Sequence, residues 1–400
     1  MTVMYSLSCL RRHSTIHIRN PLPAMFLRGG TSKGIFIKRS DLPDDPAHWD
    51  RIFLGIMGSP DKKHGRQLNG MGGGVSSLSK ICVVGPPSDT GGSSIDVEYT
   101  FAQVGIRDSG IDYSGNCGNL SSMIGVFALD EGICNQPKNI EGSTATIRSF
   151  NTNTGKLINT TFPVSFDDDR YTPLLDLDQA SIAGVPGKAS RIMLEFVSPG
   201  GARTGKLLPT GNATDTIRIA TSDKNPQLRL SLVDATNPTV FVVMSDLLDF
   251  LSPADTPSID FSSPDILKTL EIIRQRGAQL MSLDPSAQAQ PKLAILSPPS
   301  PSNPDVDVFV HVLSMGVLHK AVPMTVGLCL GVAATIKRTL AWEIVKQSRA
   351  SRTNDATDLI KIEHPSGIVD VGAEFEENGE ARSAKVIRTG RRLMKGVVWW

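Results

Sequence analysis

The chain has 400 residues, more than one hydrophobic core usually fills, so two domains of similar size are expected. Its 41 Lys and Arg residues nearly balance its 40 Asp and Glu residues, and the formal net charge is +1. That balance argues against a nucleic acid partner, because nucleic-acid-binding proteins carry a clear excess of positive charge. The five cysteines are scattered, without a C-x-x-C pair or a histidine cluster, so we expect a reducing compartment and no metal site.

The protein is expected to be soluble and cytoplasmic, with no membrane partner. Its nearest approach to a membrane span, residues 322–336, is shorter than the about 20 apolar residues that a spanning helix needs. A mitochondrial location is the alternative, because residues 1–20 carry three arginines and two histidines and the first acidic residue is Asp41. A ragged, unprocessed N-terminus explains the same composition.

Strand-like patterns dominate both halves of the chain, and each half contains one strongly apolar helix. In the first half, strands are predicted at residues 24–37, 79–84 and 95–104, followed by a helix after Cys117 and strands at 145–150 and 157–166. In the second half, strands are predicted at residues 191–196, 216–219, 227–233 and 239–244, helices at 264–277 and about 318–336, and edge strands at 367–374 and 384–393.

These patterns predict an α+β fold of two similar halves, in each of which strands wrap around one predominantly apolar helix. A helix that is apolar on nearly all sides has to be buried. The N-terminal domain is expected at residues 20–180, with the C-terminal strand near 384–400 as a candidate addition, and the second domain at 185–383. The boundary is the polar stretch 167–188. The expected active site is the cleft between the domains, at the N-termini of both central helices.

Cys117 lies in the run SGNCGN, residues 114–119, directly before the first central helix. Asn116 or Asn119 can cap this helix, and the free N–H groups of its first turn stabilise an anion in front of Cys117. That position favours a thiolate and a bound carboxylate. The alternative is a small, buried, apolar cysteine.

Three Gly-rich turns offer clustered backbone N–H groups to an oxyanion: RGGTSKG at 28–34, NGMGGG at 69–74 and PTGN at 209–212. None has the spacing of a nucleotide-binding motif. Tight turns between strands explain any one of them equally well.

Two further side chains are candidates for proton transfer or anion binding. Lys80 opens an apolar strand, so it is expected to be partly desolvated, which would let it act as a base or hold a carboxylate. A solvated lysine at a strand edge is the alternative. His319 precedes the second central helix and can titrate or bind an anion, or simply lie at the surface.

The sequence also carries a set of motifs that together resemble one known protein family. The motifs MFLRGGTSKG, IMGSPD, NGMGGGVSSLSK, SGNCGN, LLPTGN, LSMGVLH and HPSG occur in this order between about residues 25 and 394. They are similar to those of the PrpF-type 2-methylaconitate cis–trans isomerases, whose fold resembles that of diaminopimelate epimerase. The resemblance implies an α+β fold of two similar domains, each a mixed β-sheet wrapped around a central helix. The resemblance implies a cofactor-independent isomerase in which Lys80 and Cys117 are the acid/base pair.

The resemblance also implies an unsaturated tricarboxylate substrate, either 2-methylaconitate or aconitate, and a homodimer is one candidate assembly. The expected substrate-binding residues are Arg28, Thr31, Ser32, Lys33, Asn69, Gly72, Gly73, Ser79, Asn116, Gly118, Asn119, Lys206, Thr210, Gly211, Asn212, Ser314, Met315, Gly316 and His319. Two alternatives stay open: an accessory protein of an aconitase-like dehydratase, and an amino-acid epimerase on the same fold. The epimerase is disfavoured because no second cysteine starts the second central helix.

Overall fold

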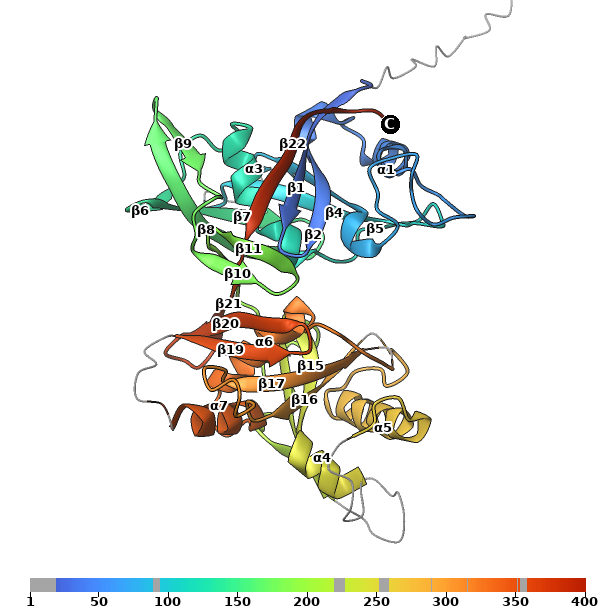
Figure 1. Ribbon diagram of the computed structural model, residues 1–400, viewed down its shortest axis with the longest axis vertical. Coiled ribbons are helices and arrows are strands. Elements are labelled where there is room, and N and C mark those ends of the chain that lie inside the picture. Colours follow the sequence, from blue (N-terminus) through green and yellow to red (C-terminus); the bar gives the residue numbers. More distant parts are fainter. Residues whose placement is uncertain are drawn as a thin grey trace, which may run out of the picture.

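The computed structural model describes residues 19–88, 94–218, 227–251, 259–288, 290–314, 316–350, 352 and 358–400. These residues form two lobes stacked along the long axis of the molecule (Figure 1). Residues 1–20 prompted the mitochondrial alternative, and residues 1–18 of this segment lie outside the described residues.

The first lobe is a mixed sheet around a short central helix. Its strands are β1 (Leu22–Gly29), β2 (Ser32–Lys38), β3 (Lys80–Gly85), β4 (Val97–Val104), β5 (Ile111–Asp112), β6 (Asn139–Glu141), β7 (Thr144–Asn151), β8 (Lys156–Asp167) and β9 (Arg170–Pro173), with the C-terminal β22 (Gly390–Val398) paired to β1. Its helices are η1 (Arg39–Asp41), η2 (Pro46–His48), α1 (Trp49–Met57), η3 (Ser76–Leu78), α2 (Gly118–Ser121) and α3 (Ile124–Asp130).

The second lobe is built in the same way around α6 (Met324–Thr335). Its strands are β12 (Ile192–Val197), β13 (Asp215–Arg218), β14 (Gln227–Ala235), β15 (Asn237–Val243), β16 (Lys292–Ser297), β17 (Val308–Ser314), β18 (Val317–Leu318), β19 (Leu359–His364), β20 (Gly367–Phe375) and β21 (Ala381–Arg388). The outer helices are α4 (Met244–Leu251), α5 (Pro264–Leu280) and α7 (Leu340–Ala350), and a separate hairpin, β10 (Ala180–Ile182) with β11 (Val185–Ala189), lies between the lobes (Figure 1).

Strand pairing runs without a break from one lobe to the other. Starting from β22, each strand pairs with the next in the order β1, β2, β3, β4, β7, β8, β12, β21, β20, β19, β17, β16, β15 and β14. Each lobe contains two parallel pairs, β2/β3 and β4/β7 in the first and β19/β17 and β16/β15 in the second. This repetition confirms the predicted fold class.

The core follows from the apolar central helices. Residues 326–334 of α6 are all buried, as are residues 124–129 of α3. Both helices contribute to one apolar cluster that continues through the two lobes. Among the described residues no single helix is long and apolar enough to cross a bilayer; α6 and α7 meet that criterion only as a pair bent by 72°.

Four expectations about elements were wrong in detail. The helix after Cys117 is interrupted, because α2 ends at Ser121 and α3 starts at Ile124. Helix α6 begins at Met324 and not near 318, since residues 317–318 pair with β17. Residues 384–393 belong to two strands, and the stretch 167–188 holds β9, β10 and part of β11 and is therefore no plain linker.

Candidate active site

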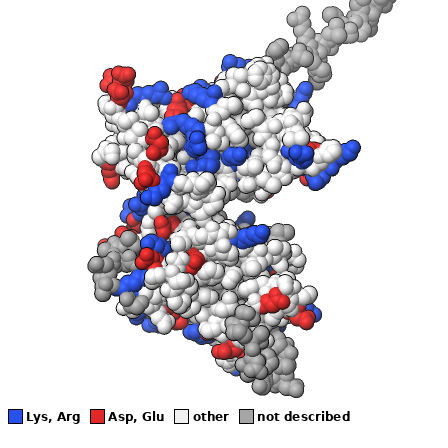
Figure 2. Space-filling model, viewed as in Figure 1, with Lys and Arg blue, Asp and Glu red and all other residues white. Residues whose placement is uncertain are grey.

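A cleft of about 740 Å³ lies between the lobes, where the surface is visibly indented (Figure 2). The first lobe lines it with the β1–β2 turn, η3, the segment leading into α2, and the β7–β8 turn. The second lobe adds residues 199–203, the β14–β15 turn and the start of α6. The predicted residues in this lining are Thr31, Ser32, Lys80, Asn116, Cys117, Gly118 and Asn119.

Cys117 is half-buried at the start of α2, and its Sγ lies 3.8 Å from Oγ of Ser32. The expected asparagine cap is wrong, because no side chain caps α2. Asn116 instead donates to Oγ of Ser121 at 3.1 Å, and Asn119 donates to Oγ1 of Thr31 at 3.1 Å. The first-turn N–H groups of α2 are therefore left without a side-chain cap beside the thiol.

Glycines let the first turn of α2 approach both lobes. A Cβ on Gly29 would lie 2.3 Å from the carbonyl oxygen of Asn119, so only glycine allows this contact with β1. A Cβ on Gly118 would lie 2.5 Å from Cε of Met324, the first residue of α6. The starts of the two central helices thus meet at the cleft.

Lys80 is the first residue of β3, and its side chain is largely buried in the cleft wall. Its ammonium donates to Oε1 of Gln103, which stands opposite it in the β3–β4 ladder, and lies 5.0 Å from the ring centroid of Phe101. The amide nitrogen of Gln103 in turn donates to the carbonyl oxygen of Ser79 at 3.0 Å. Sequence reasoning missed Gln103, because only the strand register places it beside Lys80.

Cys82 lies within electrostatic reach of both Lys80 and Cys117. This buried thiol has its pKa raised well above the usual range, first by burial and then by the negative charge of Cys117, while Lys80 lowers it. A thiol and an amine in the same cleft wall are suitable partners for proton transfer.

Arg388, which the sequence analysis also missed, lies behind the start of α2. Its Nε donates to Oδ1 of Asn119 at 3.1 Å. Burial lowers the pKa of this guanidinium to about 10, and the charge of Cys117 acts in the opposite direction.

The cleft carries only positive charge. Among the described residues that line it, Lys80, Lys156 and Arg203 are charged and none is an Asp or Glu. The Arg203 loop is fixed, because the backbone N–H groups of Arg203 and Thr204 donate to Oδ2 of Asp234 at 2.8 and 2.7 Å. A cavity with this charge pattern is suited to a substrate with several carboxylates.

The structure does not bring the other predicted residues into the cleft lining. Arg28 lines a different cavity, and Lys33 lies over the ring of Phe26, 5.8 Å from its centroid. Ser79 donates to Oε1 of Gln67 at 2.7 Å and is buried below the cleft wall. The remaining ones are Asn69, Gly72, Gly73, Lys206, Thr210, Gly211, Asn212, Gly316 and His319, while Met315 and the side chain of Ser314 lie outside what the structure describes.

Local turn structure explains several of these absences. Thr210 and Asn212 both donate to the carboxylate of Asp215, at 2.7 and 2.8 Å, so PTGN is a self-contained turn. Gly316 has φ of +71° in the β17–β18 turn.

Burial lowers the pKa of His319, and the charge of Lys292 lowers it further. A histidine held neutral in this way is a poor anion-binding group.

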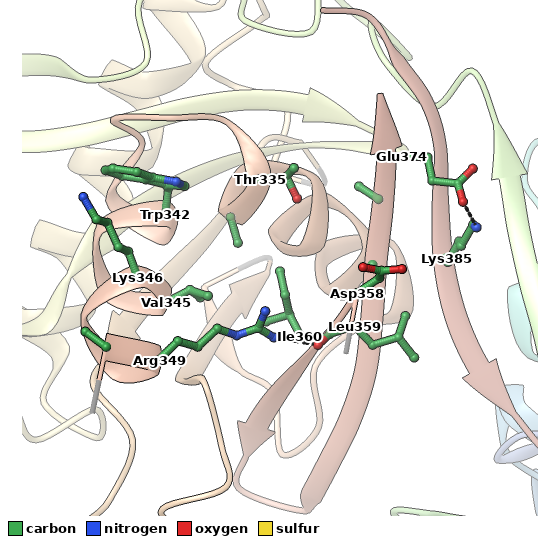
Figure 3. Close-up of a pocket in the computed structure, with 14 residues that line it drawn as sticks. Thr335, Trp342, Val345, Lys346, Arg349, Asp358, Leu359, Ile360, Glu374 and Lys385 are labelled. Carbon is green, nitrogen blue, oxygen red and sulfur yellow. Dashed lines mark hydrogen bonds and ion pairs between the residues drawn. The ribbon is translucent and has the colours of Figure 1, made fainter. Parts of the chain in front are cut away.

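Another hollow, of about 870 Å³, lies in the second lobe between α7 and the strands β19 and β20 (Figure 3). Trp342 and Lys346 line it, with the Lys346 ammonium 4.6 Å from the Trp342 ring centroid, and Glu374 pairs with Lys385 at its edge. None of the predicted residues lines it.

In the described part of the chain, no group of three or more His, Cys, Asp or Glu residues is arranged to hold a metal ion.

Comparison with known proteins identifies the family of this chain. The family model described as PrpF protein matches residues 19–400. The chain belongs to the PrpF family. The PrpF match includes both walls of the cleft, from the β1–β2 turn to the start of α6, and also the C-terminal strand β22.

Curated relatives are similar to this chain over nearly their full length. A 3-methylitaconate isomerase from Eubacterium barkeri is 35% identical, covering 94% of this chain and 97% of its own length. A 2-methyl-aconitate isomerase from Shewanella oneidensis is 33% identical, covering 94% and 96%. The crystal structure of a methylitaconate-delta-isomerase superposes with a TM-score of 0.80 at 33% identity, covering 95% of both chains.

Proposed function

We propose that this protein is a cofactor-independent isomerase that moves or inverts the double bond of an unsaturated polycarboxylic acid. The observation that carries the proposal is the cleft in which Cys117 and Lys80 share one wall with positive charges and no carboxylate. The relatives named as methylitaconate and methyl-aconitate isomerases support the same reaction class.

The reaction needs a proton to leave a carbon next to a double bond and to a carboxylate. The resulting dienolate is accessible only if its oxygens are stabilised. The N–H groups at the starts of α2 and α6, together with Lys156 and Arg203, can supply that stabilisation. Returning a proton to the other end of the allyl system completes an isomerisation with no net oxidation or reduction.

Cys117 and Lys80 are the groups that would exchange these protons. Ser32 and Asn119 hold the start of α2 against the β1–β2 turn, so the thiol has a defined position. Gln103 holds the Lys80 ammonium in the same wall. One group removes the proton, and either the same group or the other returns it to a different carbon.

The substrate class follows from the charges. Lys156 and Arg203 extend the positive region beyond Lys80 and can each bind one carboxylate, while the N–H groups at the starts of α2 and α6 face the carboxylate of the reacting end. We therefore propose a tricarboxylate such as aconitate or its 2-methyl derivative in preference to a dicarboxylate.

An epimerase that uses two thiols is not supported by this cleft. Met324 and Thr325 occupy the start of α6, where a second thiol would have to lie. Cys329 is fully buried within α6, and burial raises the pKa of its thiol to about 12. A thiol in that position cannot reach a substrate.

Proton NMR of the purified protein in D2O tests the proposal. The protein is incubated separately with cis-aconitate, trans-aconitate, 2-methylaconitate and 3-methylitaconate. Isomerisation accompanied by deuterium incorporation at an allylic carbon supports it. A folded protein that converts none of these acids contradicts the proposal. Isomerisation without deuterium exchange in single-turnover conditions, at a rate unchanged in Cys117→Ala and Lys80→Ala, contradicts it as well.

A further inference from the structure

A row of cations crosses three neighbouring strands of the first lobe. Arg28 of β1 is paired in register with Lys33 of β2 on one side and with Arg391 of β22 on the other. Directly opposed residues of antiparallel strands point to the same face of a sheet. Figure 2 shows Lys and Arg side chains gathered on this face of the lobe, along the course of β1 and β22 in Figure 1.

The row is unfavourable unless an anion neutralises it. Like charges directly opposite each other destabilise an antiparallel pair. Burial lowers the pKa of Arg28, and the charge of Arg391 lowers it further. Nη1 of Arg28 donates to uncharged oxygens, the carbonyl of Gly30 at 2.9 Å and the carbonyl and hydroxyl of Thr389 at 3.2 Å. No ion pair to Arg28 or Arg391 occurs among the described residues.

Neighbouring cations differ from these two. Arg392 is neutralised by Asp130 through two bonds of 2.6 and 2.8 Å. Lys395 and Lys38 both pair with Glu131, at 2.7 and 3.4 Å. The unneutralised charge is therefore confined to the end of β22 nearest Arg391.

This charge faces a cavity of about 660 Å³. Its walls are the paired ends of β1 and β22, residues 173–176, and strand β11 of the hairpin between the lobes. Strand β11 contributes Lys188, whose contact with Asp178 is 4.0 Å long between two exposed side chains and therefore weak. Among the described residues that line the cavity, Asp176 is the one carboxylate, against Arg28, Lys188 and Arg391; Arg392 also lines it but is neutralised by Asp130.

We propose that this cavity is a second anion site, which binds a small molecule carrying at least two carboxylate or phosphate groups. The guanidinium of Arg28 is held in the cavity wall by Gly30 and Thr389, so it is preorganised to bind an oxyanion. Arg391 and Lys188 reach the same space from the sheet and from the hairpin. The cavity shares no lining residue with the cleft, so the proposal does not depend on the proposed reaction.

Calorimetric titration in low-salt buffer, with pyrophosphate and citrate as separate probes, tests the site. The variants are Arg391→Glu in the cavity and Lys156→Ala in the cleft. The matched control is Arg276→Glu, which makes the same charge change on an exposed position of α5. Arg391 is exposed, so its replacement leaves the core intact.

We expect Arg391→Glu to weaken binding of at least one probe about tenfold or more, a loss typical of reversing a charged hydrogen-bond partner. Arg276→Glu and Lys156→Ala should leave that affinity within about twofold. Binding of pyrophosphate alone identifies a phosphate ligand. Citrate can also enter the cleft, so only citrate binding that Arg391→Glu weakens and Lys156→Ala retains identifies a carboxylate ligand of this cavity. Equal affinities in Arg391→Glu and Arg276→Glu, or loss of all binding in Lys156→Ala, would overturn the proposal.

Thermal unfolding supplies a second readout that does not require a tight ligand. Without added anion, Arg391→Ala should unfold at the same temperature as the wild type or higher, because it removes a like-charge pair. Pyrophosphate or citrate should raise the unfolding temperature of the wild type more than that of Arg391→Ala. The site would be contradicted if Arg391→Ala unfolded at a lower temperature than the wild type without anion and if added anion raised both unfolding temperatures equally.

Discussion

The thiol of Cys117 lies 3.8 Å from the hydroxyl of Ser32, at the point where the β1–β2 turn meets the start of α2. The other described cysteines, Cys82, Cys134 and Cys329, are buried, and burial raises the pKa of each thiol. Cys117 is thus the one described cysteine that opens to the cleft.

We predict that Cys117 reacts first with iodoacetamide near neutral pH, since the thiolate is the reactive form and access is required. The experiment uses a Cys9→Ser background, because Cys9 lies outside the described residues. Peptide mass spectrometry after limited labelling measures the order of modification. Preferential labelling of Cys82 or Cys329 would show that the cleft geometry is wrong.

Lys156→Ala and Arg203→Ala should raise KM about tenfold or more and leave kcat within a few-fold, because each removes a carboxylate partner that is equally useful before and during the reaction. Lys206→Ala is the control, since Lys206 is exposed close to Arg203 in sequence but does not line the cleft. Steady-state kinetics would count against the proposed binding roles if Lys206→Ala raised KM as much as Arg203→Ala.

Gly29→Ala should destabilise the protein by about 1–3 kcal/mol, the usual cost of forcing extra atoms into a packed site. The new Cβ would lie 2.3 Å from a backbone oxygen of Asn119, which cannot rotate away. Gly115→Ala is the matched control, because a Cβ there meets nothing within 4 Å. Urea unfolding of both variants measures the difference, and equal stabilities would refute the close contact between β1 and α2.

Acidification should destabilise the protein through its buried histidines. Burial lowers the pKa of His364 below its ordinary value, and the charge of Arg388 lowers it further, against an opposing effect of Glu363. Below about pH 6.5, the ordinary histidine pKa, the unfolded chain then binds more protons than the folded one, so the free energy of unfolding falls as the pH falls.

The variant His364→Asn should show a smaller fall in the free energy of unfolding between pH 7.5 and 5.5. The asparagine oxygen can still accept the Ser366 N–H that Nδ1 of His364 accepts at 3.2 Å. His64→Asn, at an exposed histidine, should behave like the wild type. Urea titrations across this pH range give the comparison. A His364→Asn slope equal to that of the wild type would remove His364 from the explanation.

The sequence predicted best what depends on local signals. Cys117 and Lys80 stand in motifs whose glycines, asparagines and serines set their own turns, and both side chains line the cleft as expected. The two-lobe fold followed from one apolar helix in each half, since such a helix must be covered on all sides.

What it missed depends on strand register and alternation. Ser32 lines the cleft, whereas its neighbour Lys33 lies over Phe26, because successive residues of a strand face opposite sides. Gln103 and Arg388 reach the site through pairing with distant strands, which no local pattern reveals. Arg203 was missed and Lys206 chosen, because nothing in the loop sequence shows which of the two faces inward.

The central claim is that Lys80 and Cys117 act together in proton transfer, and the kcat values of Lys80→Ala, Cys117→Ala and the double variant test it most directly. Each single change should lower kcat by about 10²-fold or more, and the double variant should be hardly slower than either, since groups that act as a unit are not additive. Lys80→Arg should not restore kcat, because arginine stays protonated. A wild-type kcat in Lys80→Arg would contradict the claim. A kcat in the double variant that falls by the product of the two single losses would contradict it too, because Lys80 would then not act as the partner of Cys117.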